Sequence, residues 1–370
     1  MRHAAVPSYL PQTAKVTRPA SRRSACAPSY NKIFYPEHPR ALAALPDTPA
    51  APRVTLPSNV ESCCAMTVIL AFPALAGMDY PALAERALLR VVPDPDSIRG
   101  LDAADRAAVR VLMTSASRGC SVQMIETLPS LGLVVSQGAG LDKIDIPALK
   151  ARGIRFRNIG ETQTEDVADL AMALTQMLCR RLLLADGFAR SGAWVTARFD
   201  LGDSLYGMTM GIAGLSGRIG QAIAARARAS GMQIAGLNRA SNAGLGHLHD
   251  GWQALAAASD VLVMAVPGTD DLTGIIDGPV LAALGPKGRL VNVGRGNLVN
   301  MDALIHALET GAIAGAALDV IDSEPQVPAR LAALQNVILT PHIGAQTWGQ
   351  RARAAQIAEA EILAYLAADG

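Results

Sequence analysis

The fold of this chain is most evident from the stretch Met210–Ser241, MGIAGLSGRIGQAIAARARASGMQIAGLNRAS. It opens with a short apolar run, continues through a glycine-rich turn and an alanine-rich helical pattern, and closes with a second apolar run. One helical face is marked by apolar residues at helical spacing, namely Ile219, Ala222, Ile223 and Ala227. We therefore predict strand, tight turn, helix and strand, which is a βαβ unit able to bind a dinucleotide.

The glycines of this turn fit a phosphate-binding loop with one irregularity. Gly217 and Gly220 keep the second and third positions of G-x-G-x-x-G, whereas Gly214 lies one residue too early, so the turn carries an extra residue. Glycine lets the backbone approach a pyrophosphate, and the N–H groups at the start of a helix bind its charge. By itself the motif leaves open a glycine-rich turn that binds no ligand.

Composition narrows the class of protein. The chain has 370 residues, of which half are hydrophobic and 18% are charged, which suggests about two domains. A formal net charge of +1 gives no support for nucleic-acid binding, and the chain lacks the long apolar run that a membrane span needs. The cysteines show neither metal-ligand spacing nor a disulfide framework. We expect no metal site, and a cytoplasmic protein with reduced thiols.

Four segments are predicted along the chain. Residues 1–65 are basic and rich in proline, which favours a disordered extension over a transit peptide; a start of translation at Met66 is the other interpretation. Residues 66–163 alternate strands with helices and form a first, smaller α/β domain. Residues 164–345 form the dinucleotide-binding domain, and the helix within 346–370 packs back onto the first domain.

The sequence pattern predicts the bounds of two helices. A helix is predicted over Pro81–Leu89, and a long helix over Val167–Leu184 that could connect two domains. Thr164, followed by two acidic residues, is expected to provide the N-cap of the long helix.

Three chemically useful side chains follow predicted strands of the second domain: Arg295, Glu324 and His342. In open parallel sheets ligands bind at the carboxyl ends of strands. A guanidinium binds a carboxylate through two parallel hydrogen bonds, an imidazole exchanges protons near neutral pH, and a neighbouring carboxylate orients it. Each residue alone also fits a structural role, as a surface ion pair, a turn cap or a core histidine. Their coincidence at three strand ends favours a site.

These residues lie in blocks that resemble the signatures of the D-isomer specific 2-hydroxyacid dehydrogenases. The resemblance covers roughly residues 67 to 368, in the order of the family, and rests on these blocks: Gly138–Gly140, Thr164–Ala168, Gly217–Gly220, Asn292–Gly296, Leu318–Pro325 and Thr340–Gly344. It implies an α/β fold with two Rossmann-like doubly wound parallel-sheet domains, a flavodoxin-like substrate domain first, and an active site in the cleft between them. Relatives typically form homodimers.

The resemblance also assigns roles to residues. Arg295 would bind the substrate carboxylate and polarise its carbonyl, with the backbone N–H groups of Ala139 and Gly140 holding the same carboxylate. His342 would be the general acid and base, with Glu324 as its partner. The cofactor would be bound by Thr164, Gly214, Ser216, Gly217, Arg218, Ile219, Asn238, Arg239, Ser241, Val266, Pro267, Val293, Asp319, His342 and Gly344, with Asp319 meeting the nicotinamide amide.

The end of the second strand of the βαβ unit indicates which cofactor is used. NAD-binding enzymes often place a carboxylate there for the ribose 2′-OH, but this chain has Asn238-Arg239-Ala240-Ser241-Asn242. Arg239 could pair with a 2′-phosphate, so we predict that NADP(H) is preferred and NAD(H) possible. The alternative is that Arg239 points to solvent.

The predicted activity is NAD(P)H-dependent reduction of a small 2-keto acid, similar to glyoxylate or hydroxypyruvate, to the D-2-hydroxy acid. Two alternatives stay open: an NAD-linked dehydrogenase of the phosphoglycerate type, and a non-catalytic NAD(P)H sensor similar to the corepressors of the family. The substrate side-chain pocket is not evident from the sequence. Its candidate walls are Ser115, Arg118, Trp194 and Trp348, each of which also fits a packing role, and packing is the favoured interpretation for Trp194.

Overall fold

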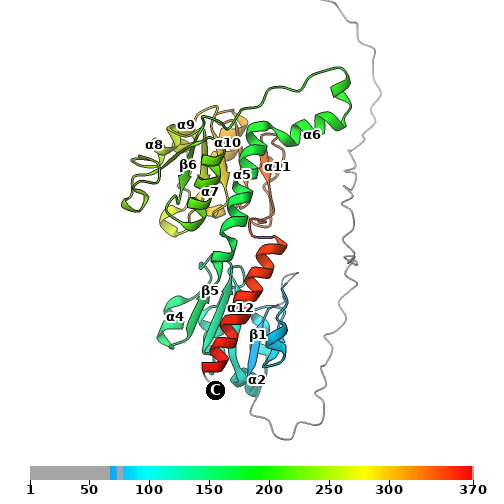
Figure 1. Ribbon diagram of the computed structural model, residues 1–370, viewed down its shortest axis with the longest axis vertical. Coiled ribbons are helices and arrows are strands. Elements are labelled where there is room, and N and C mark those ends of the chain that lie inside the picture. The colour runs from blue at the N-terminus through cyan, green and yellow to red at the C-terminus, as the bar shows by residue number, and fades with distance from the viewer. Residues whose placement is uncertain (1–66, 73–77, 369–370) are drawn as a thin grey trace, which may run out of the picture. The chain divides into compact units, whose positions relative to one another are not determined.

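The computed structural model describes residues 67–72 and 78–368. The predictions for residues 1–65 and for Met66 fall outside these ranges. The described residues form two all-parallel sheets, each flanked by helices (Figure 1). The predicted α/β fold with two Rossmann-like sheets is confirmed.

The first sheet has five strands in the order β2-β1-β3-β4-β5. The strands are β1 (Val68–Ala71), β2 (Leu88–Val91), β3 (Val109–Ser115), β4 (Leu133–Gln137) and β5 (Arg155–Asn158). The helix predicted over Pro81–Leu89 is wrong in its second half, because α1 spans only Pro81–Ala84. Leu88 pairs with Val68 of β1. A short apolar run fits either a helix or a strand, and here pairing with a neighbouring strand makes it a strand.

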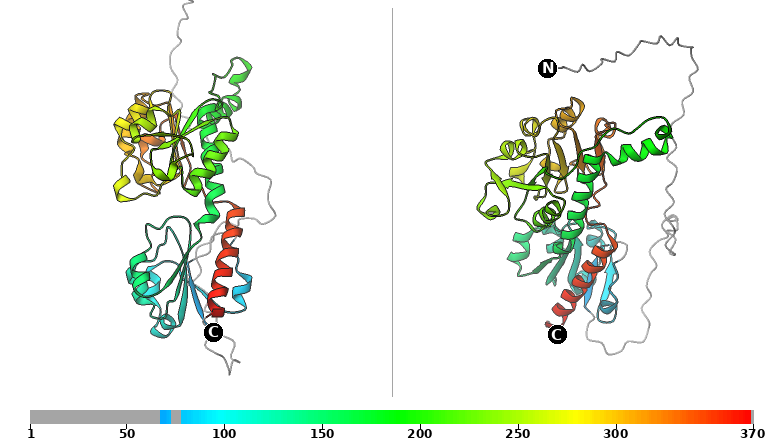
Figure 2. Two further views of the ribbon diagram at one scale, coloured as in Figure 1. Left: turned by 60° about the vertical axis from the view of Figure 1, so that its left-hand side comes forward. Right: turned by 45° about the horizontal axis from the view of Figure 1, so that its top comes forward.

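Short capped helices connect these strands, and the last helix of the chain packs on the sheet. The short helices are α2 (Ala103–Ala108), α3 (Val122–Thr127) and α4 (Ile146–Ala151), with side-chain caps from Asp102, Ser121 and Asp145. The C-terminal helix α12 (Trp348–Ala368) runs beside the first sheet (Figure 2). Its residues Ala358 and Ile362 lie in one core cluster with Ile69 of β1. Residues from the two ends of the described chain therefore share one core.

The second sheet has seven strands in the order β12-β11-β10-β9-β6-β7-β8. They are β6 (Thr209–Ala213), β7 (Gln233–Leu237), β8 (His247–His249), β9 (Val261–Met264), β10 (Arg289–Asn292), β11 (Gly315–Leu318) and β12 (Val337–Leu339). The chain runs outward from β6 to β8 and then returns to pair β9 on the other side of β6. This reversal is the position at which open α/β sheets bind ligands.

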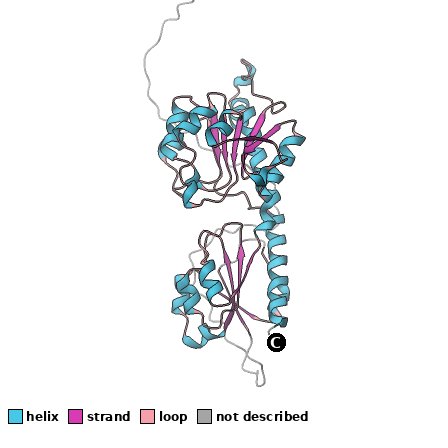
Figure 3. Cartoon of the chain, turned by 90° about the vertical axis from the view of Figure 1, so that its left-hand side faces the viewer, coloured by secondary structure: helices cyan, strands magenta, loops and turns pink. Residues whose placement is uncertain are grey.

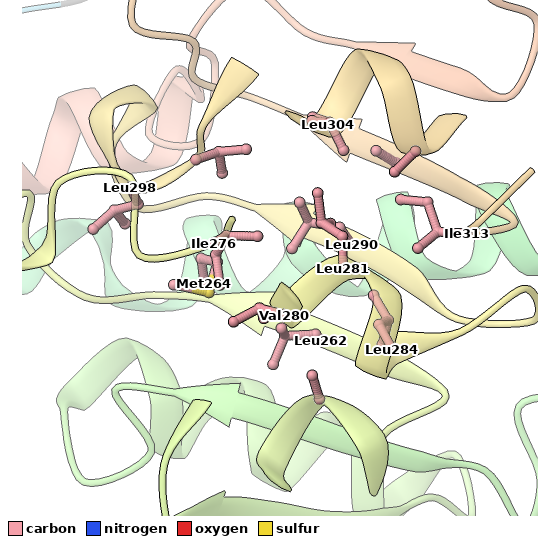
Figure 4. Close-up of a cluster of buried hydrophobic side chains, with 14 of the residues drawn as sticks. Leu262, Met264, Ile276, Val280, Leu281, Leu284, Leu290, Leu298, Leu304 and Ile313 are labelled. Carbon is pink, nitrogen blue, oxygen red and sulfur yellow. The ribbon is translucent and has the colours of Figure 1, made fainter. Parts of the chain in front are cut away.

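Helices cover both faces of the second sheet (Figure 3). They are α5 (Thr164–Arg180), α6 (Leu182–Arg190), α7 (Arg218–Ala229), α8 (Trp252–Ala257), α9 (Gly278–Leu284), α10 (Met301–Glu309) and α11 (Ala329–Ala332). On one face, Leu281 and Leu284 of α9 pack against Leu262 of β9 (Figure 4). On the other face, α5 and α7 contribute small residues such as Ala171 and Ala224. Alanine, with its small side chain, lets these helices approach the strands closely.

Six short 3₁₀ turns complete the described secondary structure: η1 (Asp96–Gly100), η2 (Gly160–Gln163), η3 (Ala193–Val195), η4 (Ala240–Asn242), η5 (Asp270–Leu272) and η6 (Gly296–Leu298). In residues 67–72 and 78–368, no helix combines the length and the apolar character needed to cross a membrane. The two cysteines in these ranges, Cys120 and Cys179, are buried free thiols, and burial raises the pKa of Cys120 to about 12.

The long helix predicted over Val167–Leu184 with an acidic first turn is present, but it ends earlier than predicted. It begins at Thr164 after Gln163, without a side-chain cap, and it ends at Arg180. Arg181 adopts a left-handed conformation (φ 51°), and its guanidinium lies 5.2 Å from the Phe199 ring centroid. The chain then leaves the sheet as α6, which has no buried residue. The chain therefore changes direction where its helical residues stop contributing side chains to the hydrophobic core.

This departing segment exposes apolar side chains. Trp194 is 69% exposed and Val195 is 88% exposed, so the packing favoured for Trp194 is not found within the described part of this chain. Other large exposed residues in the segment are Leu182, Leu183, Leu201 and Tyr206. We refer to residues 182–206 as the apolar arm.

Candidate active site

The glycine-rich turn lies at the reversal of the second sheet. Gly214 follows β6 with φ +90°, and a Cβ there would stand 2.6 Å from the Ala265 carbonyl oxygen beyond β9. A Cβ on Gly220 would overlap the Gly214 carbonyl oxygen, so this glycine permits close helix–strand packing. Within the turn, Leu215 is buried and lies close to Gly236 of β7. Gly217 precedes α7, whose N-terminus has no side-chain cap and no acidic residue in its first turn.

The end of β7 joins this turn through hydrogen bonds. The Ser216 backbone N–H donates to the Asn242 side-chain oxygen (3.0 Å), and the hydroxyls of Ser216 and Ser241 lie 3.2 Å apart. Asn242 is buried and also donates to the Leu237 carbonyl. Arg239 is exposed beside them. Asn242 was not among the predicted site residues, although an amide shortly after such a strand is a recognisable turn signal.

A carboxylate also approaches this region in space. Asn238 donates through Nδ2 to Asp250 Oδ1 at 2.7 Å, and Asp250 follows β8. The residues that directly follow β7 include no acidic residue, so the sequence pattern did not predict Asp250 as a neighbour of this site. The structure thus adds a negative group next to the predicted 2′-phosphate position.

The loop after β4 carries the predicted carboxylate-binding residues. Gly138 has φ +104°, and its carbonyl accepts a hydrogen bond from Asn158 (2.7 Å). The Ala139 N–H donates to Gln163 Oε1 at 3.1 Å, so the structure pairs this N–H with a side chain of the protein. Gly140 lies against Arg295, because a Cβ built on it would overlap Arg295 Nη2. The loop and the guanidinium are therefore neighbours, as the predicted substrate site requires.

Arg295 follows β10 in a turn that Asn292 holds. Asn292 is fully buried; it accepts from the Gly294 N–H (3.0 Å) and donates to the Arg295 carbonyl (2.8 Å). A Cβ on Gly296 would overlap the Ile321 backbone, so glycine is required after the arginine. The guanidinium donates through Nε to Asp142 Oδ2 at 3.0 Å.

His342 and Glu324 meet as predicted. Nδ1 of His342 lies 3.0 Å from Glu324 Oε2, and the other oxygen of Glu324 accepts from the Ile321 N–H at 3.0 Å. Since a carboxylate only accepts, Nδ1 carries the proton of this hydrogen bond and Nε2 is left for proton exchange. The Glu324–Pro325 peptide is cis, and His342 has φ 54°. The histidine is thus held by its loop and by one carboxylate.

Asp319 organises the loop that carries His342. It is 3% exposed and follows β11. Its carboxylate accepts from the Thr340 hydroxyl (2.7 Å) and from the N–H groups of Ile343 (2.8 Å) and Gly344 (2.9 Å). The role predicted for Asp319 toward the nicotinamide amide stays a prediction; the observed contacts give it a positioning role for the loop.

The other predicted cofactor residues lie at the ends of the same elements. Val266 and Pro267 follow β9, Val293 follows β10, and Thr164 begins α5 instead of capping it. Arg218 and Ile219 open α7. Their contacts with a cofactor stay predictions. The described part of the chain holds no cluster of metal-ligand residues.

Among the candidate walls of the side-chain pocket, Ser115 and Arg118 are in contact, because the Arg118 backbone N–H donates to the Ser115 hydroxyl at 3.2 Å. Arg118 lies 5.8 Å from the Phe72 ring centroid and donates to the Pro93 carbonyl at 3.2 Å, whereas Trp348 is 75% exposed at the start of α12. A residue not predicted is Tyr80, whose hydroxyl accepts from Gln137 Nε2 at 2.8 Å. Burial raises the pKa of Tyr80. Gln137 immediately precedes the Gly138–Gly140 loop, so Tyr80 reaches the edge of the predicted substrate site.

Known proteins share both the sequence and the fold. Residues 172–344 match the family described as D-isomer specific 2-hydroxyacid dehydrogenase, NAD binding domain. The chain is 44% identical over 243 residues to glyoxylate/hydroxypyruvate reductase A of Arabidopsis thaliana, covering 65% of this chain and 77% of that protein. It is 40% identical to hydroxyphenylpyruvate reductase of Plectranthus scutellarioides over 241 residues, covering 65% of this chain and 77% of that protein.

A solved structure extends the similarity. The NADPH-dependent glyoxylate/hydroxypyruvate reductase of Sinorhizobium meliloti, in complex with NADP and malonate, is 36% identical with a TM-score of 0.73. The match covers 82% of this chain and 94% of that chain. The glycine turn, the strand-end residues and these relatives lead to one conclusion: this chain belongs to the D-isomer specific 2-hydroxyacid dehydrogenase family.

Proposed function

We propose that the chain reduces a small 2-keto acid, of the glyoxylate or hydroxypyruvate type, to the D-2-hydroxy acid with NADPH as reductant. The observation that carries this proposal is the hydrogen bond between His342 and Glu324, together with Arg295 beside the Gly140 loop. A cation and a proton donor suit the negative charge that develops on a carbonyl oxygen during reduction.

The residues of the glycine turn fit a dinucleotide. The uncapped start of α7 presents backbone N–H groups without a competing acidic side chain, which suits a pyrophosphate. Bound NADPH would supply a hydride to the carbonyl carbon. His342 would donate a proton to the carbonyl oxygen, giving the hydroxyl group. Its side chain is 55% exposed, so water can return the proton afterwards.

Arg295 would bind the substrate carboxylate and direct the carbonyl toward His342. Two parallel hydrogen bonds from a guanidinium fix the orientation of a carboxylate. In the reverse direction His342 would act as the base. Cys120 and Cys179 as free thiols agree with the proposal that the protein works in a reducing compartment such as the cytoplasm.

A panel of 2-keto acids of increasing size, assayed with NADPH and with NADH, tests the activity. Glyoxylate and hydroxypyruvate are expected to give the highest kcat/KM, with NADPH above NADH. Highest activity in the oxidation of a phosphorylated hydroxy acid with NAD would favour the phosphoglycerate-type alternative. Binding of NADPH without turnover of any keto acid would favour the sensor alternative.

Arg239 is expected to set the preference for NADPH. Replacing Arg239 with alanine should raise the KM for NADPH about tenfold to a hundredfold, because one charge-assisted hydrogen bond to a phosphate is lost. The KM for NADH should stay unchanged. Arg330→Ala, which removes a surface arginine paired with Glu309, is the matched control. An unchanged NADPH KM in the Arg239 variant would mean that Asn238 and Asp250 define a site for the unphosphorylated ribose instead.

We further propose that the apolar arm pairs with a second copy of the chain to form a homodimer. The arm exposes several large apolar side chains, exposed apolar surface is typical of interaction sites, and aromatic residues such as Trp194 are common interface anchors. Sedimentation velocity at micromolar concentration should give twice the mass of the chain. A single-chain mass would contradict this proposal.

A further inference from the structure

The structure fixes the Arg295 guanidinium through two of its nitrogens. Nη1 donates to the Gly294 carbonyl oxygen at 2.8 Å, and Nε donates to Asp142 Oδ2 at 3.0 Å. The third nitrogen, Nη2, lies against Gly140, where a side chain would overlap it. The planar group therefore turns a defined edge toward the loop that follows β4.

Asp142 comes from that same loop. A Cβ built on Gly140 would stand 3.1 Å from Asp142 Oδ2, so the carboxylate, the glycine and the guanidinium pack as one group. The nearby cap of α4 is made by Asp145, which accepts from the Ala148 N–H at 2.9 Å. Within residues 67–72 and 78–368, Arg295 is the hydrogen-bond partner of the Asp142 carboxylate. A capping role therefore does not explain this aspartate.

The exposure of the pair indicates what it does. The side chains of Arg295 and Asp142 are 30% and 46% exposed, and ion pairs this accessible to water contribute little to the free energy of unfolding. The pair instead restricts a long, flexible side chain to one orientation. A catalytic group that is ordered before substrate binds loses less conformational entropy on binding, and small displacements of such groups are costly for turnover.

We propose that Asp142 is a positioning residue that holds the Arg295 guanidinium against the Gly140 loop, so that both bind the carboxylate of one keto acid. The inference rests on the proposed role of Arg295 in binding that carboxylate. Asp142 does not touch the reacting atoms; it acts through Arg295. Its hydrogen bond with Arg295 also links the loop after β4 of the first sheet to the turn after β10 of the second sheet.

The test compares Asp142→Asn and Asp142→Glu with the unaltered chain. The measurements are kcat and KM for hydroxypyruvate, KM for NADPH, and the dissociation constant of oxamate, a non-reducible analogue of a 2-keto acid, from the NADPH complex. Asp142→Asn should lower kcat/KM for the keto acid about tenfold to a hundredfold and weaken oxamate binding, because a neutral amide holds the guanidinium less firmly than a carboxylate does. NADPH KM should stay unchanged, and Asp142→Glu should restore part of the loss.

Asp105→Asn is the matched control, because Asp105 also pairs with an arginine, Arg90, at similar exposure. It should leave all four quantities unchanged. The second comparison is made in an Arg295→Lys background, where Asp142→Asn should cause little further loss. Additive losses would overturn the inference, since they would show that Asp142 acts without Arg295.

Two further outcomes would also overturn it. Unchanged kcat/KM and oxamate binding in Asp142→Asn would remove any positioning role. Tighter oxamate binding would show that Asp142 competes with the substrate for the guanidinium. If the unaltered chain binds oxamate but reduces no keto acid, the proposed function fails while the oxamate constants of the variants still decide the inference. If it neither binds oxamate nor reduces a keto acid, both fail.

Discussion

Replacing His342 with alanine is expected to lower kcat for keto-acid reduction by about 10²- to 10⁴-fold, which is the usual contribution of a positioned acid–base group. Nδ1 lies 3.0 Å from Glu324 Oε2, so the imidazole is oriented and its Nε2 carries the exchangeable proton. The variant should still bind NADPH, because the glycine turn is unchanged. Steady-state kinetics and a fluorescence titration with NADPH measure the two effects separately.

The matched control is His306→Ala, because His306 is an exposed histidine on α10 and has no place in the proposed mechanism. It should leave kcat unchanged. Near-normal kcat in the His342 variant would remove this residue from the mechanism. Loss of NADPH binding together with activity would instead indicate a role in holding the cofactor.

Replacing Arg295 with alanine is expected to lower kcat/KM for the keto acid by about 10³-fold, because a donor aimed at the developing charge is lost. Arg295→Lys should lose less, since lysine keeps the charge but lacks the planar fork that binds a carboxylate through two hydrogen bonds. The expected pattern is a higher KM and a lower kcat for the keto acid, with an unchanged KM for NADPH. Steady-state kinetics over both substrates measure this pattern.

Arg330→Ala again serves as the control for loss of an arginine side chain on the surface. Equal losses for alanine and lysine would show that fork geometry, and not charge alone, is needed. Retention of kcat/KM in Arg295→Ala would contradict the assigned role. A thermal unfolding scan of each variant separates loss of activity from loss of the fold, because Arg295 also contacts Asp142 across two loops.

The errors in predicted local structure have different causes. Leu88–Val91 forms an edge strand because β1 is available for pairing, and nothing local to the sequence reveals that partner. There a tertiary contact outweighs local propensity. The helix after Thr164 stops at Arg180, Arg181 takes a left-handed conformation, and the chain continues as the helix α6 without burying its residues. The helical and apolar pattern continues across this break, so it shows the helices but not the change of direction between them.

The observed site differs from the predicted one in the hydrogen-bond partners that the fold brings to its residues. Gln163 binds the Ala139 N–H, and Asp250 approaches Asn238, yet neither pair is close in the sequence. Asp319 accepts three hydrogen bonds from the loop of His342. The family resemblance had assigned Asp319 only a contact with the nicotinamide amide. Hydrogen-bond partners of this kind depend on loop geometry and carry no fixed spacing along the chain.

The amino-acid sequence was enough to predict the alternation of strands and helices, the glycine turn at Gly214–Gly220, and the chemical types of Arg295, Glu324 and His342. Hydrophobic periodicity and glycine placement act over a few residues, so they can be recognised along the chain. The folded chain was needed to find that Asp142 contacts Arg295, that Leu215 of the glycine turn is buried, and that the apolar arm exposes Trp194. These outcomes depend on which distant surfaces pack together, because burial and ion pairing are properties of the folded chain.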